Sequence, residues 1–484
     1  EGWLASPALI DLDGDRRLEI VTARHSILEA WTAGGVSLWR TAAGYSAGSS
    51  PDHGARRIWS SPAAGDFDGD GDVEIAIASD FGTSPTGNVA LYDHTGRLVP
   101  GWPAAVGRSE ARSLAAADVT GDGKLELIAS KIDLGPSTAV FSRTGELLAG
   151  WPQVSASCSK AAPSHPCLDD GGYNQNVGAG DLDGDRVADV VTTWDRMGFG
   201  IFRGDGASFT TAPGFADRMV AGVESYHDPA LAKQGWGVGD RSEFTDSPPV
   251  IADVDLDGAP EVVLVGDREY SETYEMLGAS LWVLNPDASR PRGWEWPKNA
   301  GAPLITADPG RNIVQTLPSP AVADLDGQPG VEIVFPASDG YLHVYGGDGV
   351  EHWKLRFGVG ARPYRGATEP VIADLNRDGR PEIVFATFST GRPGVAEVPV
   401  ALMVVSAAGE VLHQVPLPGR GAMAAPSIAD LEGDGDLEIV LSLKDSSPAG
   451  GVQIFEVPGS GTNCLEWPTA RGNLLRTGAY PAQG

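Results

Sequence analysis

The chain alternates short apolar runs with short acidic ones. Residues 61–79 show the pattern most clearly, because an apolar segment leads into an acidic stretch from Asp66 to Glu74, and a second apolar run follows from Ile75 to Ala78. Apolar runs of this length, bounded by Asp and Gly, predict two β-strands joined by a tight loop. The pattern recurs eight times, so the sequence is organised as a repeat.

The loops carry oxygen-bearing side chains at positions 1, 3, 5 and 9, and we expect the carbonyl at position 7 to add a ligand. Ca²⁺ takes about six to eight oxygens, and a loop that turns on Gly can direct alternate side chains to one point. We expect the sixth loop to bind most weakly, because Gln328 replaces an acid and Pro329 follows it. The predicted metal ligands are Asp11, Asp13, Asp15, Glu19, Asp66, Asp68, Asp70, Glu74, Asp118, Thr120, Asp122, Glu126, Asp181, Asp183, Asp185, Asp189, Asp253, Asp255, Asp257, Glu261, Asp324, Asp326, Glu332, Asp374, Asn376, Asp378, Glu382, Asp430, Glu432, Asp434 and Glu438.

The nearest alternative to this loop is the EF-hand, which shares the opening Asp spacing. An EF-hand needs a bidentate Glu at position 12 and a helix on either side of the loop. Here the last acid stands at position 9 and predicted strands flank the loop, so the EF-hand is excluded.

The eight loops and their flanking strands resemble the FG-GAP or VCBS repeats of the integrin α-subunit head and of many secreted bacterial propellers. The resemblance covers nearly the whole chain and is specific for a fold and a metal, not for a function. It implies an all-β fold, namely an eight-bladed β-propeller of four-stranded antiparallel blades with Ca-binding loops between first and second strands. It also implies up to eight structural Ca²⁺ ions and a bacterial protein that is extracellular, on the cell surface or periplasmic.

The repeat unit reads as four strands, which eight copies close best into a propeller. We expect one β-propeller domain over residues 1–484, with blades at about 1–48, 49–105, 106–168, 169–240, 241–305, 306–360, 361–417 and 418–484. The last blade is expected to be complete, without strand exchange between the chain ends. The fourth strand carries a Trp that we interpret as structural, since aromatic rings dominate core burial. These residues are Trp39, Trp102, Trp151, Trp296, Trp353 and Trp467.

Composition agrees with many short strands and tight turns, since 42% of the 484 residues are hydrophobic, 64 are Gly and 36 are Pro. The formal net charge is −30, and close to half of the 65 acids stand in the eight loops. Without a basic stripe we expect no nucleic-acid partner. No apolar run approaches the ~18 residues of a membrane span. The chain opens on a repeat at Glu1, as expected of a processed or a trimmed chain.

The three cysteines allow one local disulfide. Cys158 and Cys167 stand nine apart in a Pro- and Ser-rich insertion, and we expect them to pair in an oxidising compartment, with two free thiols as the alternative. Cys464 is then left over, either buried or available for an intermolecular bond or self-association.

The longest connections are predicted to gather at the end opposite the metal loops, and we expect a glycan or protein ligand there. Aromatic faces suit sugars, and guanidinium groups suit carboxylates. A loop histidine such as His227 could serve as a base in β-elimination on a uronic-acid polymer, but a solvated loop histidine is commoner and no catalytic residue is assigned. The candidate ligand-binding residues are Tyr226, His227, Trp236, Arg241, Arg268, Tyr270, Tyr274 and Arg311.

The sequence therefore favours a Ca²⁺-stabilised recognition or adhesion module. One alternative is a Ca²⁺-dependent polysaccharide lyase, because the repeats also resemble those of rhamnogalacturonan lyases. A second alternative is a structural subunit of an extracellular assembly.

Overall fold

The computed structural model describes most of the chain, with gaps that fall mainly in the long connections. None of the helices it describes is long and apolar enough to cross a membrane. The described residues are 5–49, 54–83, 86–132, 137–153, 176–194, 198–208, 215–216, 219–221, 240–243, 248–270, 276–287, 289–300, 318–357, 365–389, 399–445, 451–461 and 465–481.

The described chain is all-β, as predicted, with one short 3₁₀ helix, η1 (Ala470–Gly472). Each repeat begins with a first strand that pairs antiparallel with a second strand across the acidic loop. The first strands are β1 (Ala8–Ile10), β5 (Ala63–Gly65), β8 (Ala111–Ala117), β11 (Val177–Gly180), β17 (Val250–Ala252), β21 (Ala321–Ala323), β26 (Val371–Ala373) and β30 (Ser427–Ala429). The second strands are β2 (Glu19–Arg24), β6 (Glu74–Thr83), β9 (Glu126–Lys131), β12 (Asp189–Trp194), β18 (Glu261–Tyr270), β22 (Glu332–Pro336), β27 (Glu382–Ser389) and β31 (Leu437–Ser442).

A third strand follows in every sheet, and further strands pair either outside the third strand or, as β16 and β25 do, with the second strand on the edge where the first strand also pairs. The third strands are β3 (Ile27–Trp31), β7 (Thr86–Tyr92), β10 (Thr138–Phe141), β13 (Gly198–Phe202), β19 (Met276–Leu284), β23 (Tyr341–Gly346), β28 (Ala401–Val405) and β32 (Val452–Val457). The remaining strands are β4 (Ser37–Ala42), β14 (Phe215–Ala216), β15 (Met219–Ala221), β16 (Asp240–Glu243), β20 (Lys298–Asn299), β24 (Glu351–Arg356), β25 (Arg365–Ala367) and β29 (Val411–Pro416).

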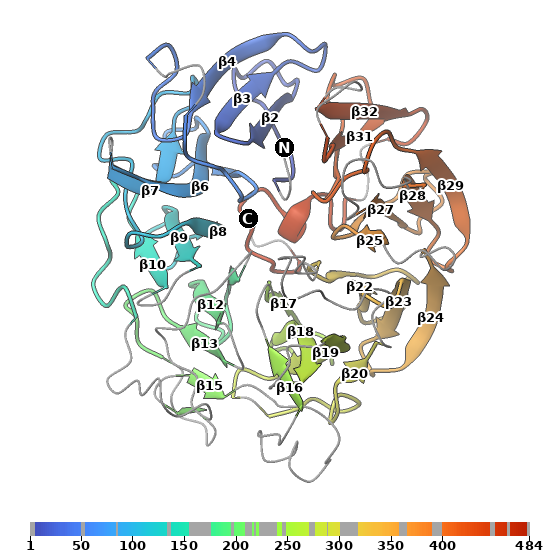
Figure 1. Ribbon diagram of the computed structural model, residues 1–484. Coiled ribbons are helices and arrows are strands. Elements are labelled where there is room, and N and C mark those ends of the chain that lie inside the picture. The colour runs from blue at the N-terminus through green and yellow to red at the C-terminus, as the bar shows by residue number, and fades with distance from the viewer. Residues whose placement is uncertain are drawn as a thin grey trace.

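Eight sheets of the described residues lie in a ring (Figure 1). Each first strand contacts the first strands of the two neighbouring sheets, and β30 of the eighth sheet contacts β1 of the first. Apolar side chains pack between successive sheets, so the core is a series of layers around the axis. At the eighth–first junction, which we call the closing junction, this layer contains Leu9, Ile20, Leu431 and Val440.

The C-terminal tail (residues 466–481) lies at the centre of the ring, where Figure 1 shows η1 and the C-terminal end. In six sheets, the residue two positions before the first loop Asp donates its backbone N–H to a tail carbonyl, at 2.8–2.9 Å. The first strands are edge strands, and the tail satisfies their free N–H groups. The bonded pairs are Ala64 with Leu474, Ala116 with Leu475, Ala179 with Thr477, Ile251 with Gly478, Ile372 with Trp467, and Ile428 with Pro468.

This tail corrects two sequence predictions. Trp467 does not stand on a fourth strand of the eighth sheet, because it is fully buried beside the seventh first strand. The eighth sheet is therefore incomplete within the described residues, with three strands ordered β30-β31-β32. The Trp-Pro pair indicated the wrong location because the same dipeptide occurs in the outer segments at Trp102 and Trp151.

Five junctions share one tryptophan contact. The indole of an outer segment donates its Nε1–H to a backbone carbonyl two positions before the turn glycine of the next sheet, at 2.8–2.9 Å. A cross-sheet bond of this kind fixes one sheet against the next. The pairs are Trp39 with His94, Trp102 with Arg143, Trp151 with Gly204, Trp294 with Gly347, and Trp353 with Ala407. At the fifth–sixth junction the contact is made by Trp294, two positions before Trp296 of the predicted Trp-Pro pair.

Candidate functional site

The acidic loops share one backbone design. In all eight, the acid at position 9 accepts a hydrogen bond from the N–H of position 2, at 2.7–3.2 Å, as Glu74 does from Phe67. Position 4 has a positive φ in every loop, and Gly occupies it in six. Leu256 and Arg377 adopt the same left-handed conformation without being Gly, a strained choice that the sequence pattern did not reveal.

The first Asp of a loop is held by backbone N–H groups. Asp66 accepts bonds from Gly69, Asp70 and Gly71, at 2.7–3.2 Å. Position 6 makes the last of these bonds in every loop except the sixth. There Pro329 has no N–H, and the Asp324 side chain accepts one described bond, from Gly327.

In each of five loops, three acidic side chains have carboxylate oxygens within 4.8 Å of one another. Each of these groups can hold a metal ion. Among the described residues, the third, seventh and eighth loops do not form such a group of three acids. In the third and seventh loops, Thr120 and Asn376 stand where others have an acid. The five groups are Asp11, Asp13 and Asp15; Asp66, Asp68 and Asp70; Asp181, Asp183 and Asp189; Asp253, Asp255 and Glu261; and Asp324, Asp326 and Glu332.

Three buried carboxylate oxygens in these loops show that the residues fit a cation. Oδ1 of Asp68, of Asp253 and of Asp374 is buried without a hydrogen-bond partner among the described residues. A buried polar atom without a partner is unfavourable, and a carboxylate can be satisfied by a bound cation. Asp374 belongs to the seventh loop, so this loop is also a candidate cation site, although it is not one of the five acidic groups. The oxygen-only donor set suits a hard cation such as Ca²⁺.

The acids at position 9 are the loop residues whose pKa values are shifted. Burial raises the pKa of Glu74 and of Glu261 to about 7, and their neighbouring aspartates act in the same direction. Burial likewise raises the pKa of Asp189 to about 7. A divalent cation would favour the charged forms and relieve the repulsion between the acids.

Two loops are altered by nearby side chains. In the fourth loop, Arg203 lies 2.6 Å from Asp183 and neutralises one of the predicted ligands. In the eighth loop, burial and then the nearby Glu432 raise the pKa of Glu438 to about 7. The eight loops are therefore unequal candidates for a cation, although their sequences follow one frame.

A buried charged cluster lies at the axis, and no sequence pattern indicated it. The side chains of Glu369, Arg471 and Arg476 are buried, with the two arginines 3% and 1% exposed. Arg471 donates to the Pro249 carbonyl, and Arg476 donates to the Pro62 carbonyl. Burial raises the pKa of Glu369 to about 7 and lowers those of both arginines to about 10, while the arginine charges oppose the shift of Glu369.

The predicted ligand-binding residues are largely beyond the described part of the chain. Strand pairing places Ser242 opposite Arg268 and Asp240 opposite Tyr270, so Arg241 lies on the strand beside them. The structure does not describe these side chains. Tyr226, His227, Trp236, Tyr274 and Arg311 lie outside the described residues, as do Cys158, Cys167 and Cys464.

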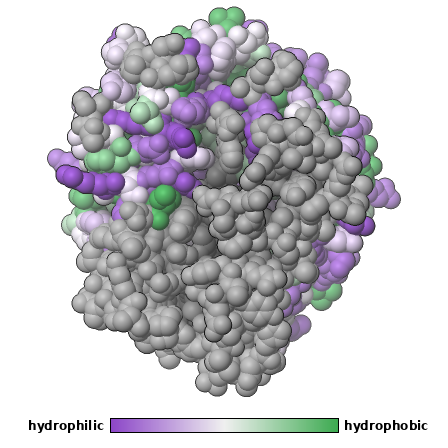
Figure 2. Space-filling model, in the orientation of Figure 1, coloured by the Kyte–Doolittle hydropathy of each residue, from purple (hydrophilic) through white to green (hydrophobic). Residues whose placement is uncertain are grey.

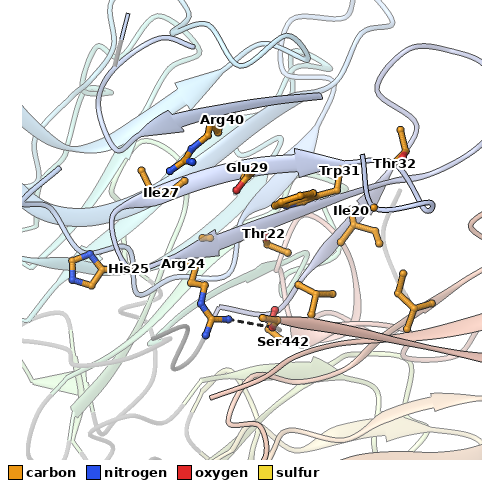
Figure 3. A pocket seen from close by; sticks show the side chains of 15 residues that line it. Ile20, Thr22, Arg24, His25, Ile27, Glu29, Trp31, Thr32, Arg40 and Ser442 are labelled. Carbon is orange, nitrogen blue, oxygen red and sulfur yellow. Dashed lines mark hydrogen bonds between the residues drawn. The ribbon is translucent and has the colours of Figure 1, made fainter. Parts of the chain in front are cut away.

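A cavity of about 730 Å³ lies at the closing junction, between β2 and β3 of the first sheet and β32 of the eighth. Ile20, Thr22 and Trp31 line the side of the first sheet (Figure 3). Val452 and Ile454 of β32 line the side of the eighth sheet. In the face seen in Figure 2, the residues over the first two sheets are mainly hydrophilic, so the apolar walls of this cavity differ from that surface.

The family model of the FG-GAP-like repeat matches residues 11–77 and 66–129. These matches contain the first three loops, and they confirm the resemblance predicted from the sequence: the chain carries FG-GAP repeats. No curated protein matches the chain.

Solved structures match the chain over nearly its whole length. Rhamnogalacturonan lyase YesW is 17% identical, with 98% of this chain and 76% of that chain covered and a TM-score of 0.50. Quinohemoprotein alcohol dehydrogenase from Comamonas testosteroni is 14% identical, with 95% and 75% covered and a TM-score of 0.52. The V. cholerae biofilm matrix protein Bap1 is 15% identical, with 99% and 93% covered and a TM-score of 0.43. At these identities the likeness concerns the fold alone.

Proposed function

We propose that this protein is a Ca²⁺-stabilised, eight-bladed β-propeller that acts outside the cell as a recognition module for a glycan or a protein. The closed ring of eight sheets supports the architecture. The five acidic groups, and the three buried oxygens without partners among the described residues, support the proposal that the loops bind Ca²⁺. Extracellular modules bind Ca²⁺ with dissociation constants of about 10⁻⁴–10⁻³ M, so these loops suit calcium concentrations found outside cells.

The tail at the axis is the observation that favours recognition. Propellers are built around a central channel. Here tail residues bond to the first strands of six sheets, and Arg471 and Arg476 occupy the space between them. The described axis is thus a packed core, and a ligand would meet the faces of the ring.

The ligand face is proposed to be the end that carries the long connections. Arg241, Arg268 and Tyr270 lie on the paired strands β16 and β18. Guanidinium groups bind carboxylates in a forked geometry, and aromatic faces stack on sugars or side chains. The same proposal allows self-association, including a disulfide through Cys464, which sedimentation with and without reductant would test.

A glycan array probed in millimolar Ca²⁺ tests the proposal. The double variant Arg268→Ala, Tyr270→Ala should lose binding to the glycan that the array reveals, while the matched control Leu412→Ala on the outer strand β29 should keep it. Loss of binding in the control alone would place the ligand on another surface.

A second candidate function is that of a polysaccharide lyase, because the repeats of this chain resemble those of rhamnogalacturonan lyases, one of which shares the fold. Incubation with uronic-acid polysaccharides, followed by the absorbance of the unsaturated product, separates the two. If the protein forms the unsaturated product and Arg268→Ala abolishes its formation, the proposed function would be catalysis and not recognition.

A further inference from the structure

The closing junction lacks the outer strand or segment found at the other described junctions. Within the described residues, β32 pairs with β31 alone, and the chain after it continues to the axis. The seventh sheet, by contrast, keeps its outer strand β29, with His413 at the position of the tryptophan. Within the described part of the chain, β32 is therefore the edge strand of the eighth sheet, and edge strands can pair with a further strand.

The cavity corresponds to the place of the missing tryptophan. At the sixth–seventh junction, a Cβ added to the turn glycine Gly409 would meet Trp353 at 2.9 Å. At the first–second junction, a Cβ on Gly96 would meet Trp39 at 2.6 Å. At the closing junction the equivalent turn glycine is Gly35, which lines the cavity and has no atom within 4 Å of the same probe.

The equivalent hydrogen-bond acceptor is also without a donor. At the five junctions that have a tryptophan contact, the indole binds the carbonyl two positions before the turn glycine, which at the closing junction is the carbonyl of Ala33. In the described part of the chain, no hydrogen bond to this carbonyl is formed. The closing junction thus has the same turn glycine and carbonyl as the five junctions with a tryptophan contact. Within the described residues it lacks the tryptophan and the outer segment that carries it.

We propose that the closing junction binds an extended segment of another polypeptide that carries a tryptophan. The segment adds antiparallel to β32 as the fourth strand of the eighth sheet, as β24 adds to β23 in the sixth. Its indole fills the cavity over Gly35 and donates to the Ala33 carbonyl. This site is separate from the long-connection face and does not depend on a ligand there.

Two further features favour such a segment. The cavity is continuous with the established sheet interface, because Ile20 belongs to both and Trp31 and Val452 pack against the same apolar cluster. Its polar rim contains Arg24 and Arg40 against one acid, Glu29, in a protein of net charge −30. A partner segment that carries an acid as well as its tryptophan matches this charge.

A synthetic peptide with the sequence of residues 145–153 serves as the probe. These residues include Glu146 and Trp151 and form an outer segment of the third sheet. Binding of the labelled peptide to the full chain in millimolar Ca²⁺, followed by fluorescence anisotropy, should be saturable. Replacing the peptide tryptophan by alanine should weaken binding about thirtyfold, as expected for a buried tryptophan that anchors an interface.

Variants of the protein locate the site. Ile454→Trp fills the cavity from β32, where Ile454 is 40% exposed, and should abolish binding. Thr22→Phe fills it from β2 and should have the same effect. The control Val411→Trp adds the same ring to the exposed strand β29 and should bind as the parent does, and melting curves show that each variant folds.

Three results of the binding assay would overturn the proposal. They are the absence of saturable binding, equal affinity for the peptide without tryptophan, and unchanged affinity in both filled variants. A dimer of the protein that Ile454→Trp dissociates would also overturn it, because a second copy would then be the occupant.

Discussion

Trp467 and Ile372 exchange two backbone hydrogen bonds, of 2.8 and 2.9 Å, across the axis-facing edge of the seventh sheet. The two residues are far apart in sequence, and their pairing turns the chain from the rim of the eighth sheet to the centre of the ring. From there the tail bonds in turn to the eighth, second, third, fourth and fifth sheets. The stability of the fold should therefore depend on the tail and on the loops at once.

Removing calcium should lower the melting temperature strongly. A ligand at ten times its dissociation constant stabilises the folded state by about 1.4 kcal/mol per site. Asp253→Asn should reduce the calcium-dependent part of the melting temperature, because Oδ1 of Asp253 is buried without a described partner. Asp205→Asn, in an exposed turn, is the control and should behave as the parent. A melting curve unchanged by excess EGTA would contradict the calcium proposal.

The second loop should matter more than the sixth. Asp66 accepts three described backbone bonds and Asp324 accepts one. Each bond contributes about 1 kcal/mol, so Asp66→Ala should lower the free energy of unfolding by roughly 2 kcal/mol more than Asp324→Ala. Urea unfolding in saturating Ca²⁺ measures both. Equal losses would show that the Pro329 turn does not weaken its loop.

Glu369→Gln should destabilise the protein severely. It leaves Arg471 and Arg476 buried without their carboxylate, and breaking a buried charge pair costs roughly 3–5 kcal/mol. Glu410→Gln, on an exposed turn, changes the same net charge and should alter stability by less than about 0.5 kcal/mol. Denaturant unfolding of both variants makes the comparison, and similar stabilities would argue against a cluster at the axis.

His343 should make stability depend on pH. Burial opposes the charged imidazolium, but hydrogen bonds to Asp339 and Glu351 outweigh it and raise the pKa above its ordinary value of 6.5. The stabilisation is then complete below pH 6.5 and is lost as the pH rises through the pKa of the folded protein. Its size is about 1.4 kcal/mol for each pH unit that separates the folded from the unfolded pKa.

The difference in unfolding free energy between the parent and His343→Gln isolates this group. It should be larger at pH 5.5 than at pH 9, with Ca²⁺ held constant. A difference that is the same at both values would mean that the histidine stays neutral.

Trp353→Phe should weaken the sixth–seventh junction. The ring is largely kept, but the bond of 2.9 Å from Nε1 to the Ala407 carbonyl is lost, at a cost of about 1 kcal/mol. Leu412→Ala on β29, where Leu412 is 41% exposed, is the matched surface control. A loss no larger than that of the control would show that the indole bond does not hold the sheets together.

The sequence was sufficient to predict what is local and repeated. The Asp spacing predicted eight loops between paired strands, and the all-β fold and the FG-GAP repeats are confirmed. It could not predict the tail, because Trp467 with its Pro has the same local pattern as Trp151, while its bonding partners come from distant first strands. The cavity was missed for the same reason, since it depends on a strand that this path removes from the eighth sheet.

Residues 467–480 follow all eight sheets in the sequence. During synthesis, the axis-facing edges of those sheets therefore form before the tail that bonds to them. Until then, the N–H groups of Ala64, Ala116 and Ala179 have no partner from the tail. Open strand edges are prone to aggregation and proteolysis. A premature stop just before the codon for Trp467 should therefore lower the cellular yield as much as one in the middle of the ring, although it leaves the strands of every sheet in the chain.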